Sequence, residues 1–222
     1  LVSSSNPGSS SNPGSSSNPG SGNNAGKGDN SGNGNNAGSG SNSGNGESQT
    51  SKQTPFAKGK TFTVSKITYK VTKVGKEVEL TTAKSTAAKV VINTVTGTDG
   101  VKYKVTSIGS KAMQNNKKMT NLTIGANVKT IGANAFSGCT KLTTVTIGKA
   151  SKSSLTTIGK SVFNGCKKLS KVTIKSTKLT SVGKQTFKGT KSSLKVKVPS
   201  KQLAKYKKIL KKAGLKVKQI TK

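Results

Sequence analysis

The residue types that carry out acid–base and metal chemistry are scarce in this chain. It has 222 residues and no His, and its five acidic residues are Asp29, Glu47, Glu77, Glu79 and Asp99. His is the usual general base and metal ligand, while paired-acid hydrolysis and carboxylate metal sites need Asp or Glu. The glycine-rich fingerprints of dinucleotide and phosphate sites are also missing. We therefore predict that the chain is not an enzyme and has no catalytic residues, metal ligands or cofactor.

Two cysteines occupy the same position of a repeated phrase. Cys139 and Cys166 each follow the sequence Phe-x-Gly. In stacked repeats such positions lie about 5 Å apart, and a disulfide needs Cα atoms about 4.4–6.8 Å apart, so a bridge is within reach. A buried Cys is also simply a small hydrophobic residue. We favour two free, packed thiols, and the pair lacks the further ligands of a zinc site.

Positive charge is the main chemical property of the chain. The net charge is +34, all 39 basic residues are Lys, and residues 101–222 contain 29 lysines and no acid. Such a field attracts polyanions and opposes self-association, which favours a monomer with a polyanionic partner. The alternative is that Lys is merely the residue this chain uses at any exposed polar position.

The first quarter of the chain has too few apolar residues to form a core. Three identical copies of Ser-Ser-Ser-Asn-Pro-Gly fill residues 3–20, and Gly, Asn and Ser continue to about residue 46. This composition does not offset the entropy cost of ordering the backbone. We predict a disordered tether over residues 1–54, with a reach of about 40 Å by random-coil scaling; the alternative is an unselected low-complexity tail. Because the chain begins at Leu1 rather than Met, we expect a processed or truncated product.

Residues 55–104 show the alternation of apolar and polar residues that is typical of strands. The alternating segments are Thr61–Val64, Ile67–Val71, Glu77–Leu80, Lys89–Ile92 and Val101–Val105. We predict that these short strands begin the fold and cover its open N-terminal end.

Residues 105–200 contain four copies of one phrase. Each copy consists of an apolar residue, two polar residues, Ile or Val, and then Gly. The copies begin at residues 105, 128, 155 and 179, so the spacings are 23, 27 and 24 residues. Four residues after each Gly comes a large apolar residue, in order Met113, Phe136, Phe163 and Phe187. A period in the twenties with this apolar spacing indicates a leucine-rich-repeat solenoid, in which each coil buries its apolar face on the next. The longer spacing predicts a surface loop at 149–154.

The last segment, residues 201–222, predicts a C-terminal cap made of a helix and a strand. Ser200 is a plausible N-cap, and Gly214 is a natural helix stop. Residues 215–220 then alternate like a strand. The apolar residues of the expected helix share one face: Leu203, Tyr206, Ile209, Leu210 and Ala213. A Lys-rich amphipathic helix also suits a membrane surface, but we favour packing on the last coil, and no apolar run approaches the roughly 18 residues of a membrane span.

The repeat resembles a known family. The phrase Thr-Ile-Gly-x-x-x-Phe-x-Gly-Cys-x-x-Leu-x-x-Val-Thr-Ile, present at 130–147 and 157–174, is similar to the BspA-type (Treponema-type) leucine-rich repeat. The first copy departs from it at Met113 and Asn116 and the last at Thr190, as expected of terminal repeats. The resemblance implies a right-handed solenoid of mainly short β-strands with short helical or 3-10 turns. It also implies a bacterial secreted or cell-surface protein used in adhesion or recognition.

The alternation within each repeat predicts which side chains point outward. If the Val, Leu and Ile residues point into the core, the outward side chains form a ladder that runs from Asn121 and Thr123 to the lysines of the last coil. The ligand-binding residues we predict on it are Thr144, Thr146, Lys171, Thr173, Lys195 and Lys197. Without aromatic residues, this ladder does not suit base stacking or sugar stacking, so nucleic acid is expected to bind only non-specifically. The alternative is that Thr and Lys are simply good exposed strand residues.

Two functions remain open from the sequence. One is an extracellular or surface adhesion module that recognises a host, microbial or matrix ligand, protein or glycan and acidic in character. The other is a structural protein held by charge to the anionic wall polymers of the cell that makes it.

Overall fold

The structure is a computed structural model that describes residues 53–149 and 152–222. The predicted tether, residues 1–54, lies outside the described residues except for its last two positions. The loop predicted at 149–154 is described only in part, and its described residues contain no strand.

The described residues form two β-sheets. The first sheet has the order β1 (Thr61–Val64), β2 (Ile67–Lys73), β3 (Glu77–Ala83), β6 (Lys102–Ile108), β8 (Thr130–Ile131), β10 (Thr157–Ile158) and β12 (Ser181–Val182), with β5 (Thr94–Thr96) paired to β6. The second sheet has the order β4 (Lys89–Ile92), β7 (Asn121–Ile124), β9 (Thr144–Ile147), β11 (Lys171–Ile174), β13 (Lys195–Lys197) and β14 (Ile220–Thr221).

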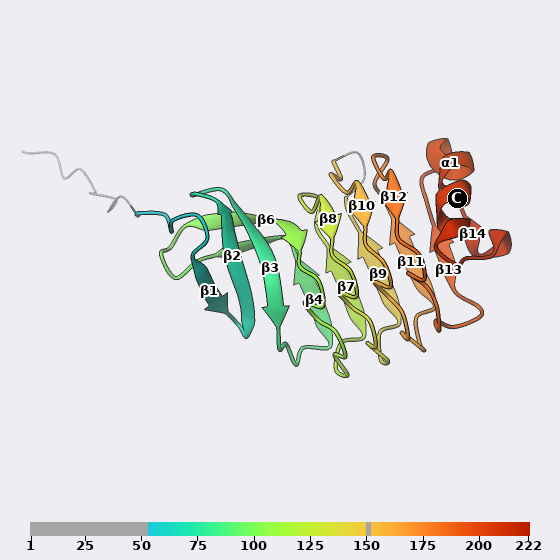
Figure 1. Cartoon of the computed structure of the whole chain (residues 1–222), viewed down its shortest axis with the longest axis horizontal. Coiled ribbons are helices and arrows are strands. Elements are labelled where there is room, and N and C mark those ends of the chain that lie inside the picture. Colours follow the sequence, from blue (N-terminus) through green and yellow to red (C-terminus); the bar gives the residue numbers. More distant parts are fainter. Residues whose placement is uncertain (1–52, 150–151) are drawn as a thin grey trace, which may run out of the picture. The chain divides into compact units, whose positions relative to one another are not determined.

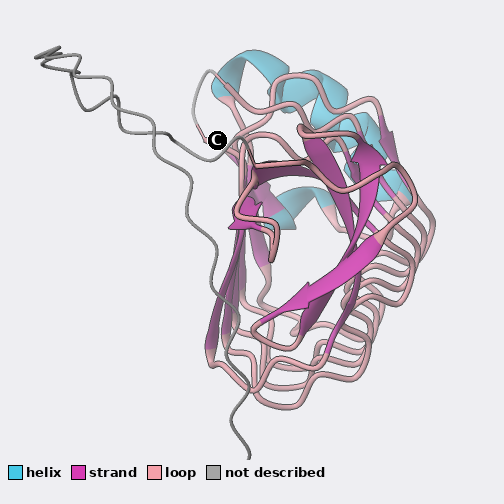
Figure 2. Cartoon of the chain, turned by 90° about the vertical axis from the view of Figure 1, so that its left-hand side faces the viewer, coloured by secondary structure: helices cyan, strands magenta, loops and turns pink. Residues whose placement is uncertain are grey.

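The repeats are coils that place one strand in each sheet, as the repeat pattern predicts. In the first sheet Ile108, Ile131 and Ile158 are successive parallel partners. In the second sheet Leu122 pairs with Val145, which pairs in turn with Val172. Equivalent residues of successive repeats therefore stack directly on one another. Figure 1 shows the strands of the second sheet side by side, and Figure 2, seen along the stack, shows the loops of successive coils one behind another. The leucine-rich-repeat solenoid is confirmed.

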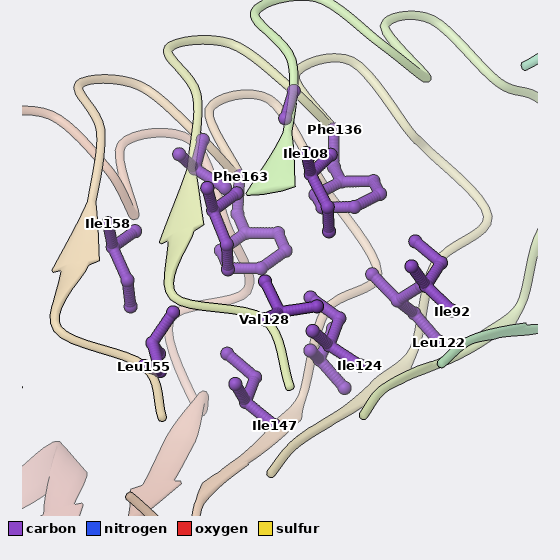
Figure 3. Close-up of a cluster of buried hydrophobic side chains, with 14 of the residues drawn as sticks. Ile92, Ile108, Leu122, Ile124, Val128, Phe136, Ile147, Leu155, Ile158 and Phe163 are labelled. Carbon is purple, nitrogen blue, oxygen red and sulfur yellow. The ribbon is translucent and has the colours of Figure 1, made fainter. Parts of the chain in front are cut away.

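The core lies between the two sheets. The inward residues of the repeats come from both sheets and point toward one another, as Ile124, Ile147 and Ile158 do in Figure 3. Phe136 and Phe163 stack with ring centroids 5.7 Å apart and planes 10° apart, and Phe163 stacks on Phe187 at 5.9 Å. Each such side chain contributes about 1.5–3 kcal/mol by leaving water, but only because the next coil covers it.

The N-terminal end is closed by an antiparallel meander. Strands β1, β2 and β3 pair antiparallel, and β3 then pairs parallel with β6, so the meander continues into the first sheet. The boundary that we drew between residues 104 and 105 falls inside β6. Strand β4 pairs parallel with β7 and so belongs to the repeat sheet rather than to the meander.

The C-terminal cap contains the predicted helix, α1 (Leu203–Lys212), with Tyr206 and Leu210 buried. Two details of the prediction are wrong. Ser200 is not an N-cap, because it begins a 3-10 turn (Ser200–Gln202) that runs into a helix without a side-chain cap. Residues 215–220 are not a strand, since Val217–Gln219 forms a second 3-10 turn and only Ile220–Thr221 joins the sheet.

Helix α1 is attached to the last coil by a buried polar contact. The hydroxyl of Tyr206 donates to the carbonyl oxygen of Ser176 at 2.8 Å and accepts from the amide of Leu179 at 3.0 Å. The apolar face of α1 is thus covered by the solenoid, as we favoured. Within the described residues no helix has the length and apolarity needed to cross a membrane.

Candidate functional site

The predicted ligand-binding residues lie together on the outward side of the second sheet. The parallel register sorts them into two columns. Thr144, Lys171 and Lys195 are successive partners in one column, and Thr146, Thr173 and Lys197 are successive partners in the other. The three lysines lie on the adjacent strands β11 and β13. Neighbouring strands are about 4.8 Å apart. We call the outward side chains of β7, β9, β11 and β13 the outer face.

Burial follows the alternation on which the prediction rested. The threonines of β9 and β11 are half-buried by their neighbours, whereas Lys171, Lys195 and Lys197 are exposed. The intervening residues, such as Val145 and Val172, are fully buried. The backbone therefore holds the Cβ atoms of the outer face in a fixed array, and the long lysine stems place their ammonium groups above it.

The outer face continues onto one strand that was not predicted to belong to it. Strand β4 extends both columns, because Lys89 pairs with Asn121 and Val91 pairs with Thr123. Val91 is 67% exposed and is the least polar position of the face. The signal was present, since Lys89-Val-Val-Ile92 has the same inward spacing as Asn121-Leu-Thr-Ile124. It was overlooked because the Ile-Gly phrase does not accompany it.

A hollow adjoins the lysine end of the outer face. It has a volume of about 320 Å³ and lies between β11, β13 and the residues that follow them. Two of the predicted residues, Thr173 and Lys197, line it, together with Lys175 and the ring of Pro199. A ligand lying along the columns therefore meets a concave end at the last two coils.

The charges of the outer face have no carboxylate near them in sequence or in the sheet register. The acids of the described residues are Glu77, Glu79 and Asp99, all in the N-terminal part. Among the described residues the one salt bridge joins the Lys129 ammonium to Glu77 at 3.4 Å, at an exposed position. No acidic side chain of the described residues therefore neutralises Lys171, Lys195 or Lys197. The described residues also contain no cluster of three His, Cys, Asp or Glu side chains that would hold a metal ion.

Both thiols are free and fully buried in the structure. The Cys139 thiol donates to the carbonyl oxygen of Met113 and the Cys166 thiol to that of Phe136, both at 3.2 Å. The neighbouring Cys139 thiol and burial together raise the pKa of Cys166. A thiol is nucleophilic only as the thiolate, so the environment of Cys166 favours packing over chemistry.

Comparison with known proteins agrees with this architecture. A sequence model described as the BspA type leucine rich repeat region matches residues 100–215, more than half of the chain. No curated protein matches the chain. A solved leucine-rich repeat protein from Bacteroides capillosus is 27% identical, with a TM-score of 0.51, and the match covers 63% of this chain and 99% of that protein.

Two further solved structures match over the same share of this chain. A leucine-rich repeat protein from Bacteroides ovatus is 30% identical, with a TM-score of 0.47, and 38% of it is covered. A leucine rich cell surface protein from Faecalibacterium prausnitzii is 24% identical, with a TM-score of 0.45, and 43% of it is covered. The chain thus spans less than half the length of these two proteins.

Proposed function

Because the chain belongs to the BspA type leucine-rich repeat proteins, we propose that it is a secreted or surface-exposed bacterial binding module and not an enzyme. Its ligand is an acidic polymer of a host, a microbe or the extracellular matrix, and the outer face is its binding surface. The family resemblance supports the location, and the scarcity of acid–base residues supports binding over catalysis.

One observation carries the choice of ligand. Lys171, Lys195 and Lys197 occupy adjacent, registered strands, with no acid anywhere after residue 99. A polyanion that lies along the columns exchanges its condensed counterions for these ammonium groups, which favours binding and makes it salt-dependent. Lysine is a point charge without the paired geometry of Arg. Attraction should therefore exceed discrimination among anionic polymers.

A second function is favoured by the spread of charge over the whole solenoid. Exposed lysines also lie on helix α1, such as Lys205 and Lys208, and on the turns, such as Lys167 and Lys188. A structural protein held on the producing cell by anionic wall polymers would use all of these charges alike. Washing producing cells with salt separates the two functions. Release by salt alone favours the structural protein, while retention together with capture of a specific ligand favours the adhesion module.

Charge reversal tests whether the outer face is the binding surface. The triple variant Lys171→Glu, Lys195→Glu, Lys197→Glu is compared with Lys205→Glu, Lys208→Glu, Lys212→Glu, which makes the same change of net charge on exposed positions of α1. Binding is measured to heparin and to poly(glycerol phosphate) at 50 and 200 mM salt. In the nucleic-acid case, six to ten phosphate contacts lose about 10³–10⁵ in affinity over this range.

We expect a steep loss of affinity with salt and a larger loss in the outer-face variant than in the helix variant. Equal losses in both variants would assign binding to net charge, as the structural protein requires. Affinity that does not change with salt would contradict a polyanionic ligand altogether.

A further inference from the structure

A second hollow lies at the C-terminal end of the stack, beside β13 and β14 (red in Figure 1), and is separate from the one on the outer face. Its volume is about 520 Å³. Its walls are the turn between Phe187 and Lys195 and the segment Gly214–Gln219 that follows helix α1. We call it the terminal pocket.

Hydrogen bonds hold the two walls of the terminal pocket together. The side-chain amide of Gln219 donates across the pocket to the carbonyl oxygen of Ser192 at 3.3 Å, and its oxygen accepts from the amide of Lys216, within the same wall, at 2.8 Å. The Lys195 ammonium donates to the carbonyl oxygen of Lys218 at 3.1 Å. Gln219 is itself buried, although Lys218 before it is exposed. The pocket is therefore a feature built by the C-terminal cap and not a gap between loose loops.

The chemistry of the lining is cationic and hydroxylic. Lys191, Lys195, Lys216 and Lys218 line the pocket with the hydroxyl-bearing residues Thr190, Ser192 and Ser193. The apolar part of the wall comes from Phe187, Leu194 and Leu215, which are nearly fully buried. Charges of one sign around a concave surface focus the field and raise the local concentration of the opposite ion. Lysine ammonium groups bind phosphate well as point charges.

We propose that the terminal pocket binds a phosphate or sulfate monoester carried by a sugar, such as the end unit of an acidic glycan or wall polymer. The volume suits this class of ligand, since small-molecule sites measure about 300–1,000 Å³. The lysine ammonium groups bind the ester oxygens, and the hydroxyl groups of Thr190, Ser192 and Ser193 bind the sugar. The proposal deepens the proposed function, because Lys195 belongs both to the outer face and to the pocket. A polymer whose end sits in the pocket can continue along the outer face.

The test titrates the full chain, labelled with ¹⁵N, with glucose 6-phosphate, glucose 6-sulfate and glucose. The pocket variant is Lys191→Gln with Lys216→Gln, and the matched control is Lys205→Gln with Lys208→Gln on α1. All four lysines are exposed, so both variants should fold, and both lower the net charge equally. Thermal unfolding of the variants confirms that the fold is kept.

We expect saturable shifts at the amides of Ser192, Ser193 and Lys216 with the esters and none with glucose. The pocket variant should bind at least about tenfold more weakly, because it loses two ammonium groups that make charge-assisted contacts with the ester. The control should stay within about twofold. Measured at about pH 5, where both esters carry close to one negative charge, tighter binding of the phosphate ester identifies a phosphorylated polymer, and the reverse order identifies a sulfated one.

Shifts that do not saturate, that spread equally to the lysines of α1, or that survive in the pocket variant would overturn the proposal. Its failure differs from failure of the proposed function. Because Lys195 belongs to both sites, the outer face is judged from Lys171→Glu with Lys197→Glu and long polymers, whereas the monosaccharide esters are too short to span the columns and report on the pocket.

Discussion

Asp99 is the acidic side chain that organises the N-terminal end. Its carboxylate accepts the Tyr103 hydroxyl at 2.6 Å and the amides of Phe56 and Val101 at 3.0 and 3.1 Å. Burial acts to raise the pKa of Asp99, but these hydrogen bonds outweigh it and hold the pKa below its ordinary value of 3.8. The charged form is therefore the one that the folded chain prefers.

A lowered pKa makes the N-terminal end sensitive to acid. A carboxyl group with a depressed folded pKa stabilises the fold fully above its unfolded value and loses that contribution as pH falls through the folded value. We expect the urea concentration at the unfolding midpoint to decrease as the pH is lowered below about 4. Asp99→Asn should lose about 1 kcal/mol at pH 7, as for one hydrogen-bonded partner, and should flatten this part of the pH profile. An unchanged profile would contradict this role of Asp99.

The two thiols give a second prediction at this scale. Because Cys139 and Cys166 are buried and free, alkylation should be slow in buffer and should add two groups in denaturant without reductant. Intact mass spectrometry measures both states. If denaturant alone gives no addition and two appear after reduction, the cysteines are bridged.

At the scale of elements, the coils stack closely because Gly ends each repeated phrase. A Cβ atom on Gly159 would lie 2.7 Å from the amide nitrogen of Ala133, and one on Gly183 would lie 2.4 Å from that of Lys160. Real Cβ atoms do not approach the backbone so closely, so one coil would have to move away from the next. The Gly of the phrase thus sets the distance between coils.

We therefore expect Gly159→Ala to destabilise the chain by about 1–3 kcal/mol, as overpacking does. The control is Gly109→Ala in the first copy, where the nearest atoms are 3.1 and 3.2 Å away and one belongs to the flexible side chain of Glu79. Urea unfolding followed by circular dichroism compares the two. Equal midpoints would mean that the coils adjust their spacing freely.

The elements also show where sequence reasoning succeeds and fails. The repeat strands were predictable because a stacked coil repeats its apolar positions with a fixed period, which also placed the residues of the outer face. The 3-10 turn at Val217–Gln219 was not, because its cause is the contact between the Gln219 side chain and the backbone at Ser192 and Lys216. The terminal pocket depends on the same contact, between segments that no local pattern connects.

At the scale of the whole molecule, stability accumulates from coil to coil, and the two ends need covers. The meander of β1 to β3 covers one end, and α1 with β14 covers the other. Beneath the C-terminal cover lie Leu179, Phe187 and Val198, which are buried, and the edge of β13, which otherwise has no partner on that side. The cover therefore hides both apolar surface and unpaired strand backbone.

Removing residues 200–222 should lower the unfolding temperature and produce oligomers, because an exposed strand edge beside apolar surface pairs with other chains. Light scattering after size-exclusion chromatography measures the oligomers. The deletion also removes nine lysines, and lower charge by itself weakens the repulsion between molecules. The control keeps the cap but replaces all nine of these lysines by Gln, which makes the same change of net charge. If the control also associates, charge and not the cover keeps the chain monomeric; if only the deletion associates, the cover does.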